Sequence, residues 1–257
     1  MRPIFRVDGA YVAVSPDAAG PWDPSMQHGS APSALVVWAA ERIATQSPMR
    51  IARVTVDLMR PVPLRDLSIE TEVLREGRKI QLCAVRLRTD DVVVVVATVL
   101  KMRQADVPLP GDVADLPVDL PGPEASRPEP ADISVSPFVK GMSLRAARGR
   151  FGTRGLGAIW YRIDRPLVKG YAVSQAMRAV VAADFCNGTG PALDFNTYTF
   201  LNADLTVNMA REPVGEWVLL DASSWIGPDG AGLATARLGD VRGYFGRVTQ
   251  SLVIEKR

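Results

Sequence analysis

The chain is poor in the residues on which much enzyme chemistry depends. It has a single histidine, His28, and only two cysteines, Cys83 and Cys186. No Cys/His spacing suited to zinc is therefore available, and no Ser-His-Asp or Cys-His triad can form without His28. We expect no metal and no cofactor, and we interpret both cysteines as small buried residues rather than as a disulfide. Any chemistry must depend mostly on carboxylates, amides, hydroxyls and backbone N–H groups.

The sequence also lacks an excess of one charge and long apolar runs. Lys and Arg total 30 against 28 Asp and Glu, which gives a formal net charge of +2. A nucleic-acid-binding protein needs a more concentrated basic field. No apolar run reaches the ~20 residues of a membrane span, and residues 92–99 are typical of a buried strand. The first residues lack the apolar stretch of a secretion signal. We expect no nucleic-acid or membrane partner and a cytoplasmic location.

One segment differs in composition from the rest of the 257 residues. Residues 104–136 contain seven prolines and seven acidic residues, with Arg127 as the only basic residue. Proline removes a backbone donor and fixes φ, so this segment cannot form a helix or a central strand. We interpret it as an extended surface linker. The predicted organisation is an N-terminal repeat at 1–103, a linker at 104–136 and a C-terminal repeat at 137–257.

The two halves carry the same strand motif. Residues 54–61 (VTVDLMRP) alternate apolar and polar side chains and end at a proline, and residues 205–213 (LTVNMAREP) do so 151 positions later. Three further strand-like runs with short turns follow each motif, which predicts an antiparallel sheet. The further runs are 67–75, 79–88 and 92–102 in the first half, and 216–226, 231–240 and 244–254 in the second.

A long helix-like run precedes the strands in each half. In the first it follows Ser30, a candidate N-cap, and in the second it follows Ser174. A short strand containing Gly-Ala, at residues 9–10 and 157–158, comes before each helix. This order predicts an α+β fold in which a curved antiparallel sheet wraps around one long helix, twice over. We expect three tryptophans in these elements to lie in the core: Trp38, Trp217 and Trp225.

These elements, in this order, resemble the double-hotdog acyl-CoA thioesterases, of the bacterial acyl-CoA thioesterase II type and its actinobacterial relatives. The resemblance covers nearly the whole chain outside the linker. It implies two tandem hotdog repeats. The matching motifs are QHGS at 27–30, AADFCNG at 182–188, FLNADLTV at 200–207, WIGPDG at 225–230 with GLA at 232–234, and RVTQ at 247–250.

The resemblance implies hydrolysis of an acyl-CoA thioester to a free acid and CoA. The family site is similar to an Asp-Thr-Gln trio that orders a water molecule, with backbone donors at the start of the first helix. The Asp corresponds to Asp184 and the Gln to Gln250. The Thr position holds Asn202, whose amide can bind water but offers no hydroxyl. Hotdog proteins commonly associate through sheet edges, which implies a homodimer.

Two of these side chains stand out on residue pattern alone. Asp184 shares the apolar face of its helix with Met177 and Val180, and a carboxylate on a buried face is costly unless it is hydrogen-bonded. It is a candidate general base; the structural alternative is a loop cap or an ion pair with Arg178. Gln250 lies on an otherwise apolar strand face and either orients the attacking water or ties the sheet to a loop.

The start of the first helix is the candidate oxyanion site. Helix N-termini present unpaired N–H groups, and Gly29 lets a thioester approach the backbone closely. We expect His28 and Ser30 to contact substrate, without His28 acting as the catalytic base. Asn202 and Thr206 are predicted to share one strand face, on which Thr206 is a reserve hydroxyl for substrate binding.

Two other functions stay open on the sequence. The first is a non-catalytic acyl-CoA-binding or scaffolding protein, which Asn202 in place of Thr favours. The second is a hotdog enoyl-CoA hydratase or dehydratase, which typically uses an Asp-His pair. We rank it lower because the nearest acid in the loop of His28 is Asp23.

Overall fold

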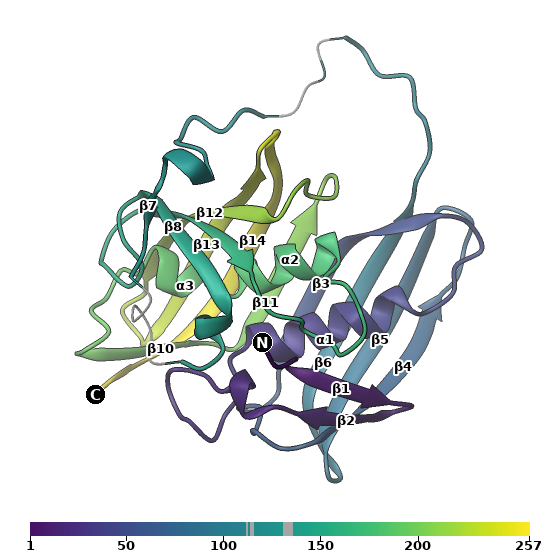
Figure 1. Cartoon of the computed structure of the whole chain (residues 1–257), viewed down its shortest axis with the longest axis horizontal. Helices are drawn as coiled ribbons and strands as arrows, with labels where there is room; N and C mark the ends of the chain where they lie inside the picture. The colour runs from purple at the N-terminus through teal and green to yellow at the C-terminus, as the bar shows by residue number, and fades with distance from the viewer. Residues whose placement is uncertain (112, 114–115, 131–135) are drawn as a thin grey trace.

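One curved antiparallel sheet holds both halves of the chain together (Figure 1). The computed structural model describes residues 1–257 except 112, 114–115 and 131–135. Within the described part, fourteen strands form the sheet in the order β1-β2-β4-β5-β6-β3-β11-β14-β13-β12-β9-β8-β7, and β10 pairs with β14. The predicted double hotdog is confirmed, with two helix-and-sheet units joined edge to edge.

The first half contributes six strands and one long helix. The predicted strands at 67–75, 79–88 and 92–102 are present with shifts of one residue at most. The elements are β1 Phe5–Asp8, β2 Tyr11–Val14, a 3-10 turn Pro16–Ala18, α1 Ser30–Glu41, β3 Met49–Leu58, β4 Leu67–Arg75, β5 Ile80–Thr89 and β6 Val92–Arg103.

The second half repeats this order with a divided first long strand. Residue 203 separates β10 from β11, where the first half has the continuous strand β3. The elements are 3-10 turns Pro123–Ala125 and Val139–Gly141, β7 Arg127–Pro128, β8 Met142–Arg148, β9 Gly157–Ile163, α2 Gln175–Ala183, α3 Cys186–Thr189, β10 Tyr198–Asn202, β11 Asp204–Met209, β12 Trp217–Ile226, β13 Ala231–Asp240 and β14 Gly243–Lys256.

The repeats meet where their equivalent strands pair. β3 and β11 run antiparallel, and Thr55 lies opposite Thr206, its counterpart 151 positions along the chain. The sheet is therefore continuous across the junction, with an approximate two-fold relation centred on this pair. Both halves place their alternating valines on the inner face; Val54, Val56 and Val207 are fully buried.

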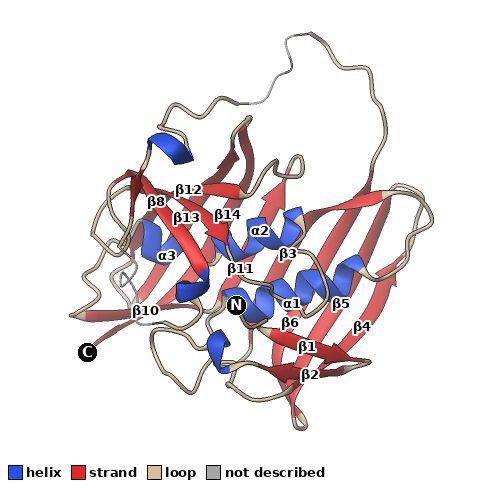
Figure 2. Ribbon diagram, in the orientation of Figure 1, coloured by secondary structure: helices blue, strands red, loops and turns tan. Residues whose placement is uncertain are grey.

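Both long helices lie against the inner face of the sheet, next to each other (Figure 2). Residues 30–40 of α1 are all buried. This helix therefore has few polar side chains on any face. α2 buries one apolar face and begins at Ser174, whose hydroxyl accepts from Met177 N–H. Ser30, in contrast, is not an N-cap as predicted: Gly29 holds the cap position, and the Ser30 side chain is used elsewhere.

Three expectations about elements are corrected. Gly9 and Ala10 form the turn of the β1–β2 hairpin, with φ of +59° at Gly9, whereas Gly157 begins strand β9. The two Gly-Ala pairs are therefore not equivalent, and each half starts with a hairpin rather than one strand. Trp225 is 70% exposed and is not in the core, while Trp38 and Trp217 are buried.

The predicted linker at 104–136 includes residues 112, 114–115 and 131–135, which lie outside the described residues. Residues 116–121 lie against the outer face of the second half, whereas the stretch after β6 arches away from the sheet (Figure 1). Leu116 forms a backbone bridge with Tyr244, and the Pro121 carbonyl accepts from the Trp160 indole. Both cysteines are free and buried, as expected. In the described part of the chain, no helix has the length and apolarity to cross a bilayer.

An ion pair with a buried carboxylate links the connection before β12 to the end of β13. Arg211 donates to both carboxylate oxygens of Asp240, at 2.5 and 2.9 Å. Burial alone would raise the pKa of Asp240, but hydrogen bonds from Arg211 and from the N–H groups of Arg242 and Val214 hold this pKa below its ordinary value of 3.8. The stabilisation is therefore fully present above pH 3.8 and is lost as the pH falls from that value through the lower pKa of Asp240 in the folded protein.

We predict that Asp240→Asn lowers the free energy of unfolding at neutral pH by about 3 kcal/mol, because the half-buried Arg211 guanidinium loses its buried counter-charge. Urea denaturation measures this difference, which should shrink as the pH falls below about 4. Asp106→Asn, at an exposed site, is the control. A difference that stays constant from pH 7 to pH 3 would contradict the assignment.

Candidate active site

A buried carboxylate lies where the two repeats meet. Asp184 follows the last residue of α2 and is 5% exposed. Its Oδ2 lies 3.1 Å from the Ser30 hydroxyl and 3.1 Å from Nδ1 of His28. Its Oδ1 accepts from the side-chain amide of Asn202 at 3.2 Å. Donors from both repeats thus hold one anion that neither repeat could bury alone.

The imidazole of His28 is fixed by two aromatic rings. Its ring centroid lies 5.0 Å from that of Phe138 and 4.6 Å from that of Phe185. Nδ1 is also 3.2 Å from the Ser30 N–H, and one nitrogen cannot donate to Asp184 while accepting from Ser30. The carboxylate is the stronger partner, so we assign the proton to Nδ1. The Ser30 N–H is then left without an acceptor at the start of α1.

A bulge turns Asn202 toward Asp184. Asn202 pairs with Leu252 of β14, but Thr206 pairs with Thr249, so this strand has one extra residue between the two pairs. Asn202 therefore lies on the inner face with Leu252. Thr206 lies on the outer face, within hydrogen-bond distance of Thr55. The expectation that Asn202 and Thr206 share a face is wrong, because regular alternation does not continue through residue 203.

Gln250 touches the main chain of Asp184 rather than its carboxylate. Its side-chain amide donates to the Asp184 carbonyl at 3.2 Å and accepts from the Asn187 N–H at 3.1 Å. The Asn187 side chain in turn donates to the Phe200 carbonyl of β10. These bonds fix the junction of α2 and α3 to the sheet. Sequence reasoning missed Asn187, although it lies in the quoted AADFCNG motif.

Gly29 lies directly against the carboxylate. A Cβ at this position would be 2.7 Å from Oδ1 and 2.9 Å from Oδ2 of Asp184. Its backbone is helical, with φ of −56°, so the reason for glycine here is space and not backbone strain. Within the described residues, its N–H has no hydrogen-bond acceptor. The Asp184 carboxylate thus packs directly against the backbone of Gly29, whose N–H is unpaired among the described residues.

One structural alternative for Asp184, an ion pair with Arg178, does not match its contacts. Arg178 pairs with Glu216 and not with Asp184. Burial raises the pKa of the neighbouring Cys186 thiol and keeps it protonated. In the described part of the molecule, no three His, Cys, Asp or Glu side chains group closely enough to hold a metal ion.

The first repeat has no second copy of this site. Thr98 lies 151 positions before Thr249, the same offset that relates Thr55 to Thr206. By that offset Ile51 and Val99 take the places of Asn202 and Gln250, and β3 has its own register shift between Ile51 and Arg53. Both replacements are buried and apolar. Within the described residues, this arrangement of polar side chains therefore occurs once.

The fold and this junction site together define a double-hotdog protein of the thioesterase type. Residues 18–102 match the model of the acyl-CoA thioesterase N-terminal domain, and residues 110–254 match that of the C-terminal domain. The chain belongs to the acyl-CoA thioesterase family and is a thioesterase. No curated protein sequence matches the chain.

Solved structures of low sequence identity share the fold. A hotdog-fold protein of unknown function from Alicyclobacillus acidocaldarius has a TM-score of 0.74 and 17% identity, over 98% of this chain and 95% of that one. A tesB protein from Mycobacterium avium subs. paratuberculosis has a TM-score of 0.70 and 18% identity, over 97% and 95%. Acyl-CoA thioesterase II TesB2 from Mycobacterium marinum has a TM-score of 0.68 and 13% identity, over 98% and 94%.

We predict that Gly29→Ala lowers kcat for thioester hydrolysis at least about tenfold, because the new methyl group must displace the Asp184 carboxylate. Thiol release from acyl-CoA esters measures the rate. Gly122→Ala is the matched control, since a Cβ there meets no atom within 4 Å. A Gly29→Ala enzyme with native kcat would show that the carboxylate does not need this position.

Proposed function

We propose that the protein hydrolyses acyl-CoA to a free acid and CoA, with water activated by Asp184. The observation that carries this proposal is the arrangement of the carboxylate. Oδ2 lies 3.1 Å from His28 Nδ1 and 3.1 Å from the Ser30 hydroxyl, which the Val181 carbonyl shares at 3.0 Å. Among the described residues, Oδ1 has only Asn202 as a donor, and it lies against Gly29. A water molecule on Oδ1 would lie beside the unpaired N–H groups at the start of α1.

The proposed reaction is a direct attack of water on the thioester carbonyl carbon. Asp184 takes one proton from the water as the C–O bond forms, and the carbonyl oxygen becomes an oxyanion. The Gly29 and Ser30 N–H groups donate to that oxyanion; one such donor contributes about 10²–10³ in rate. Collapse breaks the C–S bond, and the proton on Asp184 goes to the departing CoA sulfur. No metal and no covalent intermediate is part of this route.

Four other side chains have roles that follow from their contacts. His28 and Ser30 orient the carboxylate, and both lie close enough to the proposed oxyanion site to border the substrate. Asn202 holds Oδ1 and bonds water in place of the family's Thr. Gln250 is a positioning residue, because it bonds the Asp184 main chain. Thr206 has no part in the proposal.

One observation favours a second candidate, hydration of an enoyl-CoA. From the sequence this reaction ranked lower, because no acid lies near His28 in its own loop. In the structure, however, Nδ1 of His28 lies 3.1 Å from the Asp184 carboxylate. An imidazole and a carboxylate at one site suit proton addition across a double bond. The products separate the two reactions, because hydrolysis releases a thiol and hydration leaves the thioester intact.

We also propose a cytoplasmic location, where acyl-CoA is available, and a homodimer. The two buried free thiols fit a reducing compartment.

We predict that Asp184→Asn lowers kcat at least about 10²-fold, because an amide cannot accept the proton from water. Thiol release over short, medium, long and aryl CoA esters measures the loss, and circular dichroism checks the fold. Asp106→Asn is the control. Binding of a non-hydrolysable CoA thioether should survive the substitution. Native hydrolysis of the whole panel by the variant would refute the role of Asp184, and a native protein that binds every ester without thiol release would favour the non-catalytic alternative.

We predict that Asn202→Ala lowers kcat about 10- to 100-fold, the range expected for one hydrogen bond to a charged group. Asn202→Thr should recover most of that loss, since its hydroxyl can donate to Oδ1 and bond water. The matched control is Asn208→Ala, at an exposed position of β11. Equal activity in the Ala and Thr variants would show that Asn202 does not hold the carboxylate in the reaction.

A further inference from the structure

Three arginine side chains lie next to one another on the outer face of the sheet, where the repeats join. Arg53 of β3 and Arg247 of β14 both lie opposite Asn208 of β11, the strand between them. On the other side of β14, Arg237 of β13 lies opposite Arg247. We call Arg53, Arg247 and Arg237 the arginine row. Strand pairing thus brings together guanidinium groups from both repeats.

Only one member of the arginine row has a counter-charge within the described part of the chain. Arg237 donates to Asp221 at 2.6 and 3.2 Å, and Arg148 pairs with the same carboxylate. Arg247 and Arg53 form no ion pair there, and the Nε of Arg53 is buried without a hydrogen-bond partner. Like charges directly opposite each other destabilise a sheet. An excess of positive charge therefore remains at the arginine row.

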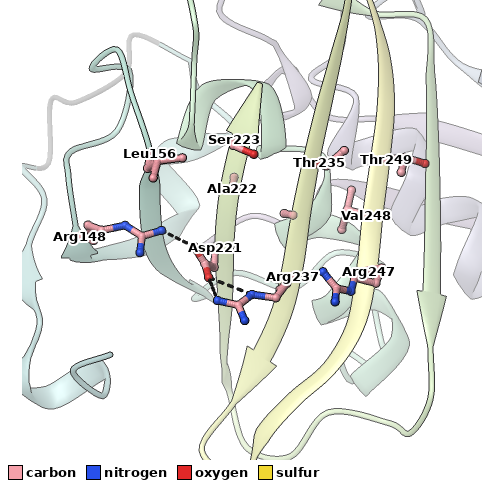
Figure 3. A pocket seen from close by; sticks show the side chains of 11 residues that line it. Arg148, Leu156, Asp221, Ala222, Ser223, Thr235, Arg237, Arg247, Val248 and Thr249 are labelled. Carbon is pink, nitrogen blue, oxygen red and sulfur yellow. Dashed lines mark hydrogen bonds and ion pairs between the residues drawn. The ribbon is translucent and has the colours of Figure 1, made fainter. Parts of the chain in front are cut away.

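Two surface depressions meet at Arg237 and Arg247, which line both of them. The larger has a volume of about 650 Å³ and also contains the hydroxyl groups of Ser223, Thr235 and Thr249. Figure 3 shows these hydroxyls in one row and the two arginines in the row beside it. Guanidinium and hydroxyl groups are both donors that bind phosphate oxygens.

The smaller depression, of about 450 Å³, adds Arg53 and an apolar wall. The wall includes Met102 of β6, which is 42% exposed, and Leu116, which is 64% exposed. Apolar side chains beside unpaired guanidinium groups suit a ligand that has an organic part as well as an anionic part. The side chains that form the wall are Leu100, Met102, Leu116 and Tyr244.

The spacing of the two unpaired arginines matches two phosphoryl groups. The backbones of Arg53 and Arg247 are separated by two strand spacings, about 10 Å. A guanidinium binds phosphate best through two parallel hydrogen bonds. Two linked phosphoryl groups offer each of these arginines its own pair of oxygens, whereas a single phosphoryl group must be shared between them.

We infer that the arginine row binds a small organic diphosphate of the nucleoside diphosphate class. Its phosphoryl groups lie on Arg53 and Arg247, and its organic part covers the apolar wall. Asp184 and Asn202 lie against the inner face of the sheet, so the sheet separates this ligand from the proposed reaction. The inference is independent of the proposed function.

The acids on the outer face limit the length of the anion. Asp57 lies four residues along β3 from Arg53 and opposite Asp204 of β11. A long polyanion such as a nucleic acid would meet these two carboxylates if it followed the strands, and Asp221 if it crossed them. A diphosphate confined to Arg53 and Arg247 avoids all three.

Calorimetric titration of the full-length chain with ADP tests the site. We expect one ADP per chain and a Kd that rises with salt concentration. ADP should bind at least about tenfold more tightly than AMP, which lacks the second phosphoryl group. It should also bind more tightly than inorganic pyrophosphate, which has no organic part to cover the apolar wall.

Substitution of the two unpaired arginines locates the ligand. Arg247→Gln and Arg53→Gln should each raise the Kd of ADP at least about tenfold, since each removes charge-assisted hydrogen bonds. Arg247 is exposed, so its replacement leaves the packing unchanged, and circular dichroism checks both variants. Arg78→Gln, in the exposed β4–β5 turn, is the control with the same charge change. Asp184→Asn should bind ADP with the native Kd, because Asp184 lies on the other face.

Four results would overturn the inference. The first is a native chain that binds no ADP, or binds it no more tightly than AMP. The second is native affinity in both Arg247→Gln and Arg53→Gln. The third is loss of ADP binding in Asp184→Asn, which would place the nucleotide on the inner face. The fourth is pyrophosphate that binds as tightly as ADP, since the apolar wall would then contact nothing. None of these results bears on thioester hydrolysis, which is measured separately by thiol release.

Discussion

The burial of one carboxylate is the constraint on which the site depends. An anion in a protein interior needs donors, and those of Asp184 come from the α1 end of the first repeat and from β10 of the second. Neither repeat has the full set. The carboxylate can therefore be buried only at the junction of the repeats, where donors from both reach it. Packing of α1 against α2 is required for this site as well as for the core.

The two repeats share one backbone arrangement, and the polar site occurs where their side chains differ. The strands pair through equivalent residues, Thr55 and Thr206, yet the inner positions near the equivalent bulges differ in character. Asn202 and Gln250 of the second repeat correspond to Ile51 and Val99 of the first. The polar pair fixes a carboxylate, whereas the apolar pair completes a core. The same backbone therefore carries a polar cluster in the second repeat and apolar core residues in the first.

The two faces of the sheet carry different residues of the motif at 200–207. The inner face packs the helices and holds Asn202 beside Asp184, and a single extra residue before β11 moves Thr206 to the outer face. The outer face carries Thr206 beside Thr55. The bulge thus places Asn202 beside Asp184 and Thr206 on the opposite face, although the two residues are only four positions apart in the chain.

The sequence determined the two repeats, the antiparallel sheet, most of the long strands and the burial of Asp184, because alternation and helical spacing are local properties. Motifs also named Asn202, Gln250 and Gly29. The sequence did not determine that His28 reaches Asp184 or that Gln250 bonds the main chain of Asp184. It also did not determine that residue 203 interrupts the alternation of the strand or that Trp225 is exposed. These outcomes depend on which atoms far apart in the chain come within about 3 Å of each other, or on how strands pair, and the packing of the two repeats decides both.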